Sequence, residues 1–154
     1  MTGMPLVKLV NGEPVEMDAQ EEAEFLASQA DPSGQRARLK RALQQAYEAR
    51  LLQGFVHQSK NFALDEASQR RLTSAYSFAG DAEAGGVTWP PSFAWRASDN
   101  SYLPLLTPAS CKTFCRAGST EAVRLNFLLF AKKDELAALA DEALAGFDPD
   151  QGWT

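Results

Sequence analysis

The stretch GFVHQSKNFALDEAS, residues 54–68, holds the end of one predicted element and the start of another. Gly54 stands where the residue after a helix C-terminus would lie, since glycine adopts the left-handed conformation needed there at little cost. Phe55-Val56 and residues 62–64 are apolar and predict two short strands. Ser59-Lys60-Asn61 predicts the turn between them. The stretch therefore predicts a hairpin that follows a helix.

His57, the only histidine of the chain, falls on the first of these strands. We interpret it as a solvated or hydrogen-bonded strand residue. A general base is the alternative, although no cysteine or nucleophile motif lies near it in sequence. Phe62 on the second strand is predicted to be a buried anchor against the helix that contains Leu39.

Helices are predicted on both sides of the hairpin. Residues 35–52 have apolar side chains at offsets 0, 3, 4, 7, 8 and 12, the spacing of one helix face. Asp65 predicts the N-cap of the next helix, whose apolar positions repeat at offsets 0, 3, 4 and 7 before Gly80. The positions predicted to form these two faces are Leu39, Ala42, Leu43, Ala46, Tyr47, Leu51, Leu72, Ala75, Tyr76 and Ala79.

The first 34 residues are predicted to form a separate leader, and residues 35–154 the main domain. Asn11-Gly12 lies between two apolar runs and predicts a tight hairpin over residues 5–17. Asp18 with Glu21 predicts a capping box and a short acidic helix to about residue 29. Residues 31–34, DPSG, are interpreted as a linker. The leader has too few apolar residues for a core of its own, so we expect it to dock on a neighbour.

The C-terminal half predicts another hairpin and more helix. The segment FAWRASDNSYLPLL, residues 93–106, alternates apolar and polar residues around a turn at 98–100. Thr107-Pro108 then predicts a helix start. We expect this helix to pause at Gly118-Ser119, to resume with an apolar face at Val123, Phe127, Phe130 and Ala131, and to be followed by a final helix over residues 134–145. The predicted fold class is α+β, a small domain of amphipathic helices packed with short antiparallel β-hairpins.

Composition excludes several classes of partner. The chain has 154 residues with a formal net charge of −5, which disfavours nucleic acid and anionic membranes as main partners. It has no apolar run long enough to cross a bilayer, and its N-terminus does not read as a signal peptide. We expect a soluble protein that is not exported by the usual route.

Motifs that carry chemistry are few. Cys111 and Cys115 lie four apart, which places them on one helix face, but a metal site would need two further ligands. We interpret them as two small thiols on a helix. The chain has no GxGxxG, P-loop, GxSxG or HExxH pattern, and its carboxylates fall mostly at predicted helix starts. We expect no catalytic residue, cofactor or metal, with a hidden catalytic carboxylate pair as the alternative.

The order of these signals resembles the DUF4376 family of phage and prophage proteins. The similarity covers about residues 36–153 and consists of short signals in a fixed order. The residues that carry it are Gly54-Phe55, Phe62, Asp65, Trp95, Asp99-Asn100 and Leu106-Thr107. The resemblance carries over no catalytic residue.

This resemblance implies a non-enzymatic bacteriophage tail component, a structural or adaptor protein of the baseplate or tail fibres. It would be made in the host cytoplasm and reside in the virion tail, with other tail, baseplate or tail-fibre proteins as partners. A tail-fibre assembly chaperone is the alternative, and a small unrecognised enzyme or host-directed factor is a further one.

Aromatic and aliphatic side chains outside the predicted helix faces are the candidate partner-interface residues, since such residues anchor interfaces. We expect Trp95 to be core and Trp153 to fold back on its own domain, with insertion into a partner as the alternative for Trp153. The candidates are Trp89, Trp153, Phe147, Leu6 and Leu9.

Overall fold

The structure is a computed structural model of the chain, and it describes residues 6–154. Over these residues four α-helices, one 3-10 helix and three separate two-stranded antiparallel hairpins follow one another, which confirms the predicted α+β class. In chain order the elements are β1 (Val7–Val10), β2 (Glu13–Glu16), α1 (Ala19–Ala30), α2 (Pro32–Gln53), β3 (Phe55–His57), β4 (Lys60–Phe62), α3 (Glu66–Glu83), β5 (Ala94–Arg96), β6 (Tyr102–Pro104), α4 (Pro108–Ala138) and η1 (Asp141–Gly146).

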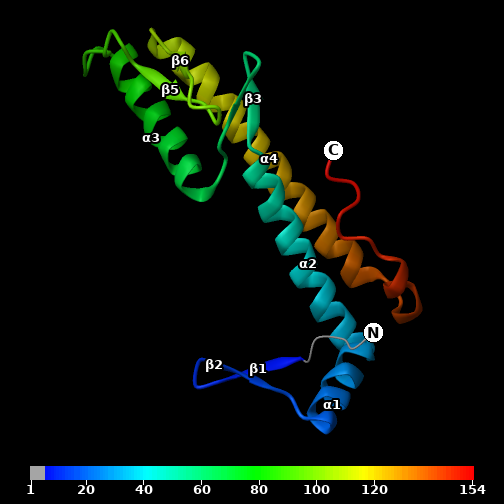
Figure 1. Cartoon of the computed structure of the whole chain (residues 1–154). Coiled ribbons are helices and arrows are strands. Elements are labelled where there is room, and N and C mark those ends of the chain that lie inside the picture. The colour runs from blue at the N-terminus through cyan, green and yellow to red at the C-terminus, as the bar shows by residue number, and fades with distance from the viewer. Residues whose placement is uncertain (1–5) are drawn as a thin grey trace.

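The molecule is elongated, and its axis is formed by α2 and α4, which pack side by side (Figure 1). Helix α3 and the hairpins β3–β4 and β5–β6 gather around the N-terminal half of α4. The hairpin β1–β2 and helix α1 lie at the other end, beside the start of α2. The leader therefore stands apart from the part of the chain that holds most of the core.

The hairpin β3–β4 forms at the predicted place, but its turn is shifted by one residue. Gln58 and Ser59 occupy the turn with φ of 47° and 63°, and Lys60 already pairs with His57 in the strands. A two-residue hairpin turn of type I′ requires positive φ at both central residues, and these two supply it. The predicted turn at residues 59–61 is therefore wrong.

Gly54 ends α2 with φ of 74°, as the sequence predicts. A Cβ atom here would also lie 2.0 Å from the carbonyl oxygen of Phe62. Glycine is thus required both by backbone conformation and by the close approach of β4.

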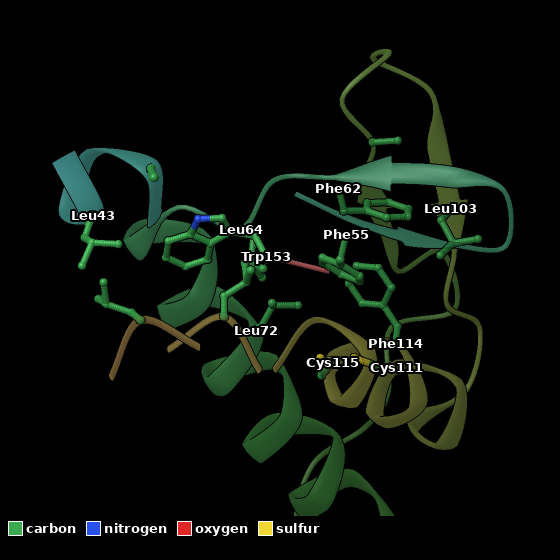
Figure 2. Close-up of a cluster of buried hydrophobic side chains, with 14 of the residues drawn as sticks. Leu43, Phe55, Phe62, Leu64, Leu72, Leu103, Cys111, Phe114, Cys115 and Trp153 are labelled. Atoms are coloured by element: carbon green, nitrogen blue, oxygen red, sulfur yellow. Dashed lines mark hydrogen bonds between the residues drawn. The ribbon is translucent and has the colours of Figure 1, made fainter. Parts of the chain in front are cut away.

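Phe62 is fully buried, as predicted, within an aromatic cluster that is centred on Phe114 (Figure 2). Its ring lies edge-on to Phe114 of α4, with centroids 4.8 Å apart, and 5.6 Å from Phe55 of β3. Trp95 of β5, which is half-buried, packs on the same Phe114 ring at 5.1 Å. The rings around Phe62 thus come from β3 and α4. The sequence predicts instead that Phe62 packs against the helix that contains Leu39.

Helix α4 runs without interruption through Gly118-Ser119, so the predicted pause is wrong. A Cβ atom at Gly118 would lie 2.7 Å from Leu72 Cδ1 and 2.8 Å from the Phe55 ring. Glycine is present at this position because α3 and β3 approach the helix closely there, which is a packing role and not a break.

The predicted final helix over residues 134–145 is also wrong. Its first part belongs to α4, which ends at Ala138, and its second part is the 3-10 helix η1. Arg36 of α2 donates from Nη1 to the carbonyl oxygen of Leu136 at 2.7 Å and from Nη2 to Asp141 Oδ1 at 2.9 Å. These bonds satisfy a carbonyl that the helix leaves free at its C-terminus and favour termination there.

The leader has the predicted local elements. Asn11 and Gly12 form the turn with φ of 52° and 88°. The Asp18 carboxylate accepts a hydrogen bond from the Glu21 amide at 2.9 Å, and Glu21 accepts one in return from the Asp18 amide, which confirms the capping box. The predicted hairpin starts at residue 5, which lies outside the described residues.

The linker predicted at residues 31–34 is not a separate segment, because residues 32–34 belong to α2. Asp31 caps α2 by accepting a hydrogen bond from the Gly34 amide at 2.7 Å, and Pro32 occupies the first turn. An aspartate followed by proline is a favourable helix start, since the ring removes a donor that would have no partner in the helix. Only Asp31 separates α1 from α2.

Candidate interaction surfaces

The hairpin β1–β2 presents apolar side chains to solvent. Val7 and Leu9 are 56% and 76% exposed, and their positions alternate along one face of β1, whereas Leu6 before the strand is half-buried. Lys8 points to the other face and forms an ion pair with Glu21 of α1. The hydrogen bond from Lys8 holds the pKa of the Glu21 carboxyl below its usual range. The ion pair thus fixes the hairpin to α1 and leaves the Val7 and Leu9 face free.

The leader is strongly acidic, in contrast to the rest of the chain. Residues 1–34 have one lysine and seven carboxylates, a formal charge of −6. Residues 35–154 have 14 lysines and arginines against 13 carboxylates, a formal charge of +1. Apolar and acidic groups therefore lie together at one end of the molecule, and a partner for this surface needs complementary apolar and cationic groups.

Trp89 is half-buried in the loop between α3 and β5. Its indole Nε1 donates to the Leu105 carbonyl oxygen at 3.0 Å, and its ring lies 4.8 Å from Phe93 and 5.5 Å from Phe78. The indole thus holds this loop against the β5–β6 hairpin.

Trp153 is 3% exposed and folds back on its own domain, as expected. Its ring contacts Tyr47 of α2, and Lys132 Nζ of α4 lies 5.4 Å from the ring centroid. Its Nε1 donates to the Pro149 carbonyl oxygen at 2.8 Å, and Phe147 before it is half-buried. Burial also raises the pKa of the Tyr47 hydroxyl. The C-terminal tail therefore covers the groove between α2 and α4.

His57 is half-buried, and its ring lies edge-on to Phe114 at 5.5 Å. Its strand partner is Lys60, whose Nζ donates to Ser101 Oγ at 2.6 Å. The imidazole thus packs on the aromatic cluster. Its strand partner Lys60 links the β3–β4 hairpin to the loop of the β5–β6 hairpin.

Cys111 and Cys115 are both buried, with sulfurs 3.9 Å apart, on the predicted common face of α4. Burial and the neighbouring Cys111 raise the pKa of the Cys115 thiol to about 12, and burial raises the pKa of Cys111 as well. Both thiols are therefore protonated near neutral pH. Over residues 6–154, no group of three or more His, Cys, Asp or Glu side chains is placed to hold a metal ion.

A hollow of about 470 Å³ lies between the start of α3 and the β5–β6 hairpin. Arg71 and Arg96 line it, together with the Trp95 side chain and Asn100. Arg71 donates to Ser68 Oγ at 3.1 Å. The titratable side chains that line this hollow are cationic, so the hollow itself presents no general base.

The apolar face predicted for the second half of α4, at Val123, Phe127, Phe130 and Ala131, faces solvent and does not pack on the core. Val123, Phe127 and Phe130, here called the α4 stripe, are 53%, 69% and 51% exposed. At 3.6 residues per turn they lie opposite the face that packs against α2. The buried side chains on this half of α4 are Leu125, Leu129, Lys132 and Leu136.

The residues that carry the resemblance mostly hold the fold together. Asp65 caps α3 by accepting a hydrogen bond from the Ser68 amide at 3.0 Å. Asp99 accepts hydrogen bonds from both the amide and the hydroxyl of Ser101 in the β5–β6 turn. Thr107 forms a capping box at the start of α4. These residues thus fix helix starts and turns.

Comparison with known families covers most of the chain. The family model described as "Domain of unknown function (DUF4376)" matches residues 34–150. The chain belongs to the DUF4376 family. The match begins at the start of α2 and includes every element up to η1, so β1, β2 and α1 precede it. No curated protein and no solved structure matches this DUF4376 chain. No helix within residues 6–154 combines the length and apolar character needed to cross a membrane.

Proposed function

We propose that this DUF4376 protein is a non-enzymatic bacteriophage tail component, a structural or adaptor protein associated with the baseplate or tail fibres. The observation that carries the proposal is the contrast between the leader and the main domain. The leader exposes apolar side chains and carries a charge of −6, whereas residues 35–154 have a charge of +1 and hold the buried core around Phe55, Phe62 and Phe114. Such a division suits a protein whose main domain is stable and whose leader binds a neighbouring subunit.

The structure of the leader supports a docking role. A two-stranded hairpin alone is marginally stable in water, and its free strand edges can pair with another chain. Val7 and Leu9 supply apolar area for such a contact, and the surrounding carboxylates add charge selectivity. A partner that pairs with the β1 edge would use a common mode of strand addition.

The assignment to a phage tail is supported by the resemblance of residues 36–153 to phage and prophage proteins. It is tested by quantitative mass spectrometry of purified particles from a phage that encodes this chain. We expect its peptides at a fixed ratio to other tail proteins. Absence from particles, together with binding to a tail-fibre protein in the lysate, would instead indicate an assembly chaperone. Absence from both would overturn the proposal.

The role of the leader is tested in the same particles with a matched pair of substitutions. Leu9→Asp changes an exposed leader residue, whereas Tyr102→Asp changes a 60% exposed residue of β6 at the far end of the molecule. We expect Leu9→Asp to reduce incorporation and Tyr102→Asp to leave it unchanged. Equal incorporation of both variants would show that the leader is not the docking element.

A further inference from the structure

The leader and the α4 stripe have complementary surfaces. We propose that the leader of one copy of this chain docks on the α4 stripe of a second copy, in a head-to-tail contact. This inference rests on the proposed function, because it names the neighbour on which the leader docks. It is tested on the purified protein, however, so its outcome does not depend on whether the chain is present in phage particles.

The first observation is the cationic rim beside the stripe. Lys40 and Arg41 of α2 and Lys133 of α4 line a groove of about 440 Å³ between the two helices, together with Gln44 and Ala137. Lys133 lies one turn beyond Phe130, so the groove lies beside the C-terminal end of the stripe, where Asp134 on the stripe face adds a carboxylate beside these cations. In the part of the chain that the structure describes, none of these three cations forms an ion pair. A partner for this surface therefore needs apolar side chains bordered by carboxylates.

The second observation is that the leader has this composition. Leu9 and Leu26 are 76% and 54% exposed, and Phe25 of α1 is 39% exposed. The leader also contains seven carboxylates, of which Glu21 is paired with Lys8. Leader and stripe thus match in both respects, since each offers apolar area and the two rims have opposite charge.

A contact between two α4 stripes is less favourable. The exposed parts of Val123, Phe127 and Phe130 amount to on the order of 300 Å², well below the roughly 800 Å² per partner of a standard interface. Pairing two stripes would also bring the Lys40, Arg41 and Lys133 rims of both copies close together, and like charges repel. The leader supplies both the missing area and the opposite charge.

A second copy is needed because the stripe is exposed within one chain. The leader lies at the N-terminal end of α2 (Figure 1) and leaves Phe127 uncovered. A head-to-tail contact uses different surfaces on the two copies, so every pair retains one free leader and one free stripe. Such contacts close into rings when the rotation allows and otherwise continue as filaments.

The test is analytical ultracentrifugation of the full chain over a range of concentrations. We expect the mean mass to rise above the 16.8 kDa of one chain as concentration increases. Leu9→Asp and Phe127→Asp should each weaken association at least tenfold, with unchanged helical circular dichroism because both side chains are exposed. Tyr102→Asp is the matched control and should associate like the unmodified chain. A monomer at every concentration would overturn the proposal.

Mixing the two variants separates a head-to-tail contact from a symmetric one. The Leu9→Asp chain keeps its stripe, and the Phe127→Asp chain keeps its leader, so an equimolar mixture should form a complex of twice the monomer mass. That complex should dissociate as sodium chloride is raised, because exposed charge pairs are screened. If the mixture stays monomeric although the unmodified chain associates, the leader does not bind the stripe and the proposal is wrong; if one variant alone associates like the unmodified chain, the contact is between like surfaces and the proposal is wrong as well. If the chain associates as expected but is absent from particles, the proposed function fails and this inference stands.

Discussion

The hairpins β1–β2 and β3–β4 have the same local geometry and opposite surroundings. Both turn through two residues with positive φ, Asn11-Gly12 in one and Gln58-Ser59 in the other. Phe55 and Phe62 on β3–β4 are 5% and 0% exposed. Val7 and Leu9 on β1–β2 are exposed by more than half.

The difference teaches that a hairpin's turn sets its register, whereas its packing partner sets its stability. The β3–β4 strands lie on α4, where Gly118 lets the Phe55 ring approach the helix backbone. The β1–β2 strands form an ion pair to α1 through Lys8 and Glu21. Within the described residues, neither strand belongs to the hydrophobic core. We therefore expect substitutions around β3–β4 to affect stability and those in the leader to affect association.

The largest effect is expected for Phe62→Ala. Removing this fully buried ring should lower the free energy of unfolding by about 3–5 kcal/mol, from lost burial and the cavity that remains. Chemical denaturation measures it, with His57→Ala as the control on the same hairpin. We expect His57→Ala to cost under about 1 kcal/mol and to leave assembly unchanged. A normal midpoint for His57→Ala with lost assembly would contradict the scaffold interpretation of His57.

A smaller loss is expected for Trp153→Ala, which removes the side chain that holds the C-terminal tail between α2 and α4. The free energy of unfolding should fall by about 2–3 kcal/mol, at or below the usual range for tryptophan because the site is near a terminus. Thermal melts of the isolated protein measure it. Leu52→Ala, at a 77% exposed position of α2, should melt like the unmodified chain. An unchanged melt for Trp153→Ala together with failed assembly would make the tail an interface.

Gly118→Ala tests whether this glycine serves packing. The added methyl would lie 2.7 Å from Leu72 and 2.8 Å from the Phe55 ring, so the neighbours must shift, at a cost of about 1–3 kcal/mol. Gly80→Ala in α3 is the control, since nothing lies within 4 Å of its added Cβ. That change should stabilise the helix by about 0.5–1 kcal/mol. Stabilisation by both substitutions in urea unfolding would show that β3 does not pack closely on α4.

The smallest effect on stability is expected from removal of residues 1–30. Asp31 remains to cap α2, and the buried residues from Leu39 onward are intact. The shortened chain should keep helical circular dichroism and a cooperative melt, with a change in unfolding free energy within about 1 kcal/mol. Loss of the cooperative melt would instead place the leader in the core.

Local signals in the sequence predicted most of the elements. Asp18, Asp65 and Thr107 each accept a hydrogen bond from a backbone amide near a helix start, and Asn11-Gly12 forms the predicted turn. These features involve residues a few positions apart, so a single sequence contains the information that determines them. The same holds for the burial of Leu43 and Leu72, which follows from the helical spacing of apolar residues.

The errors occur where distant segments decide the outcome. Gly118 has the local character of a helix breaker, and only the approach of Leu72 and the Phe55 ring explains it. Helix α4 has two apolar faces, and spacing alone does not tell which of them meets α2. A comparison of the two faces could have identified the α4 stripe, since the Leu125 and Leu129 face continues to Leu136 whereas the Phe127 face meets Asp134.

Hydrogen exchange of the full chain, measured by mass spectrometry at a concentration where it is monomeric, tests the contrast between the hairpins most directly. Amide protection reports the free energy of local opening, from near zero for weakly held segments to the global value for the core. We predict that the amides of β3–β4 open only with global unfolding, while those of β1–β2 open at a cost of about 0–1 kcal/mol. Equal protection of the two hairpins would contradict the division of this chain into a stable domain and a leader that binds a neighbour.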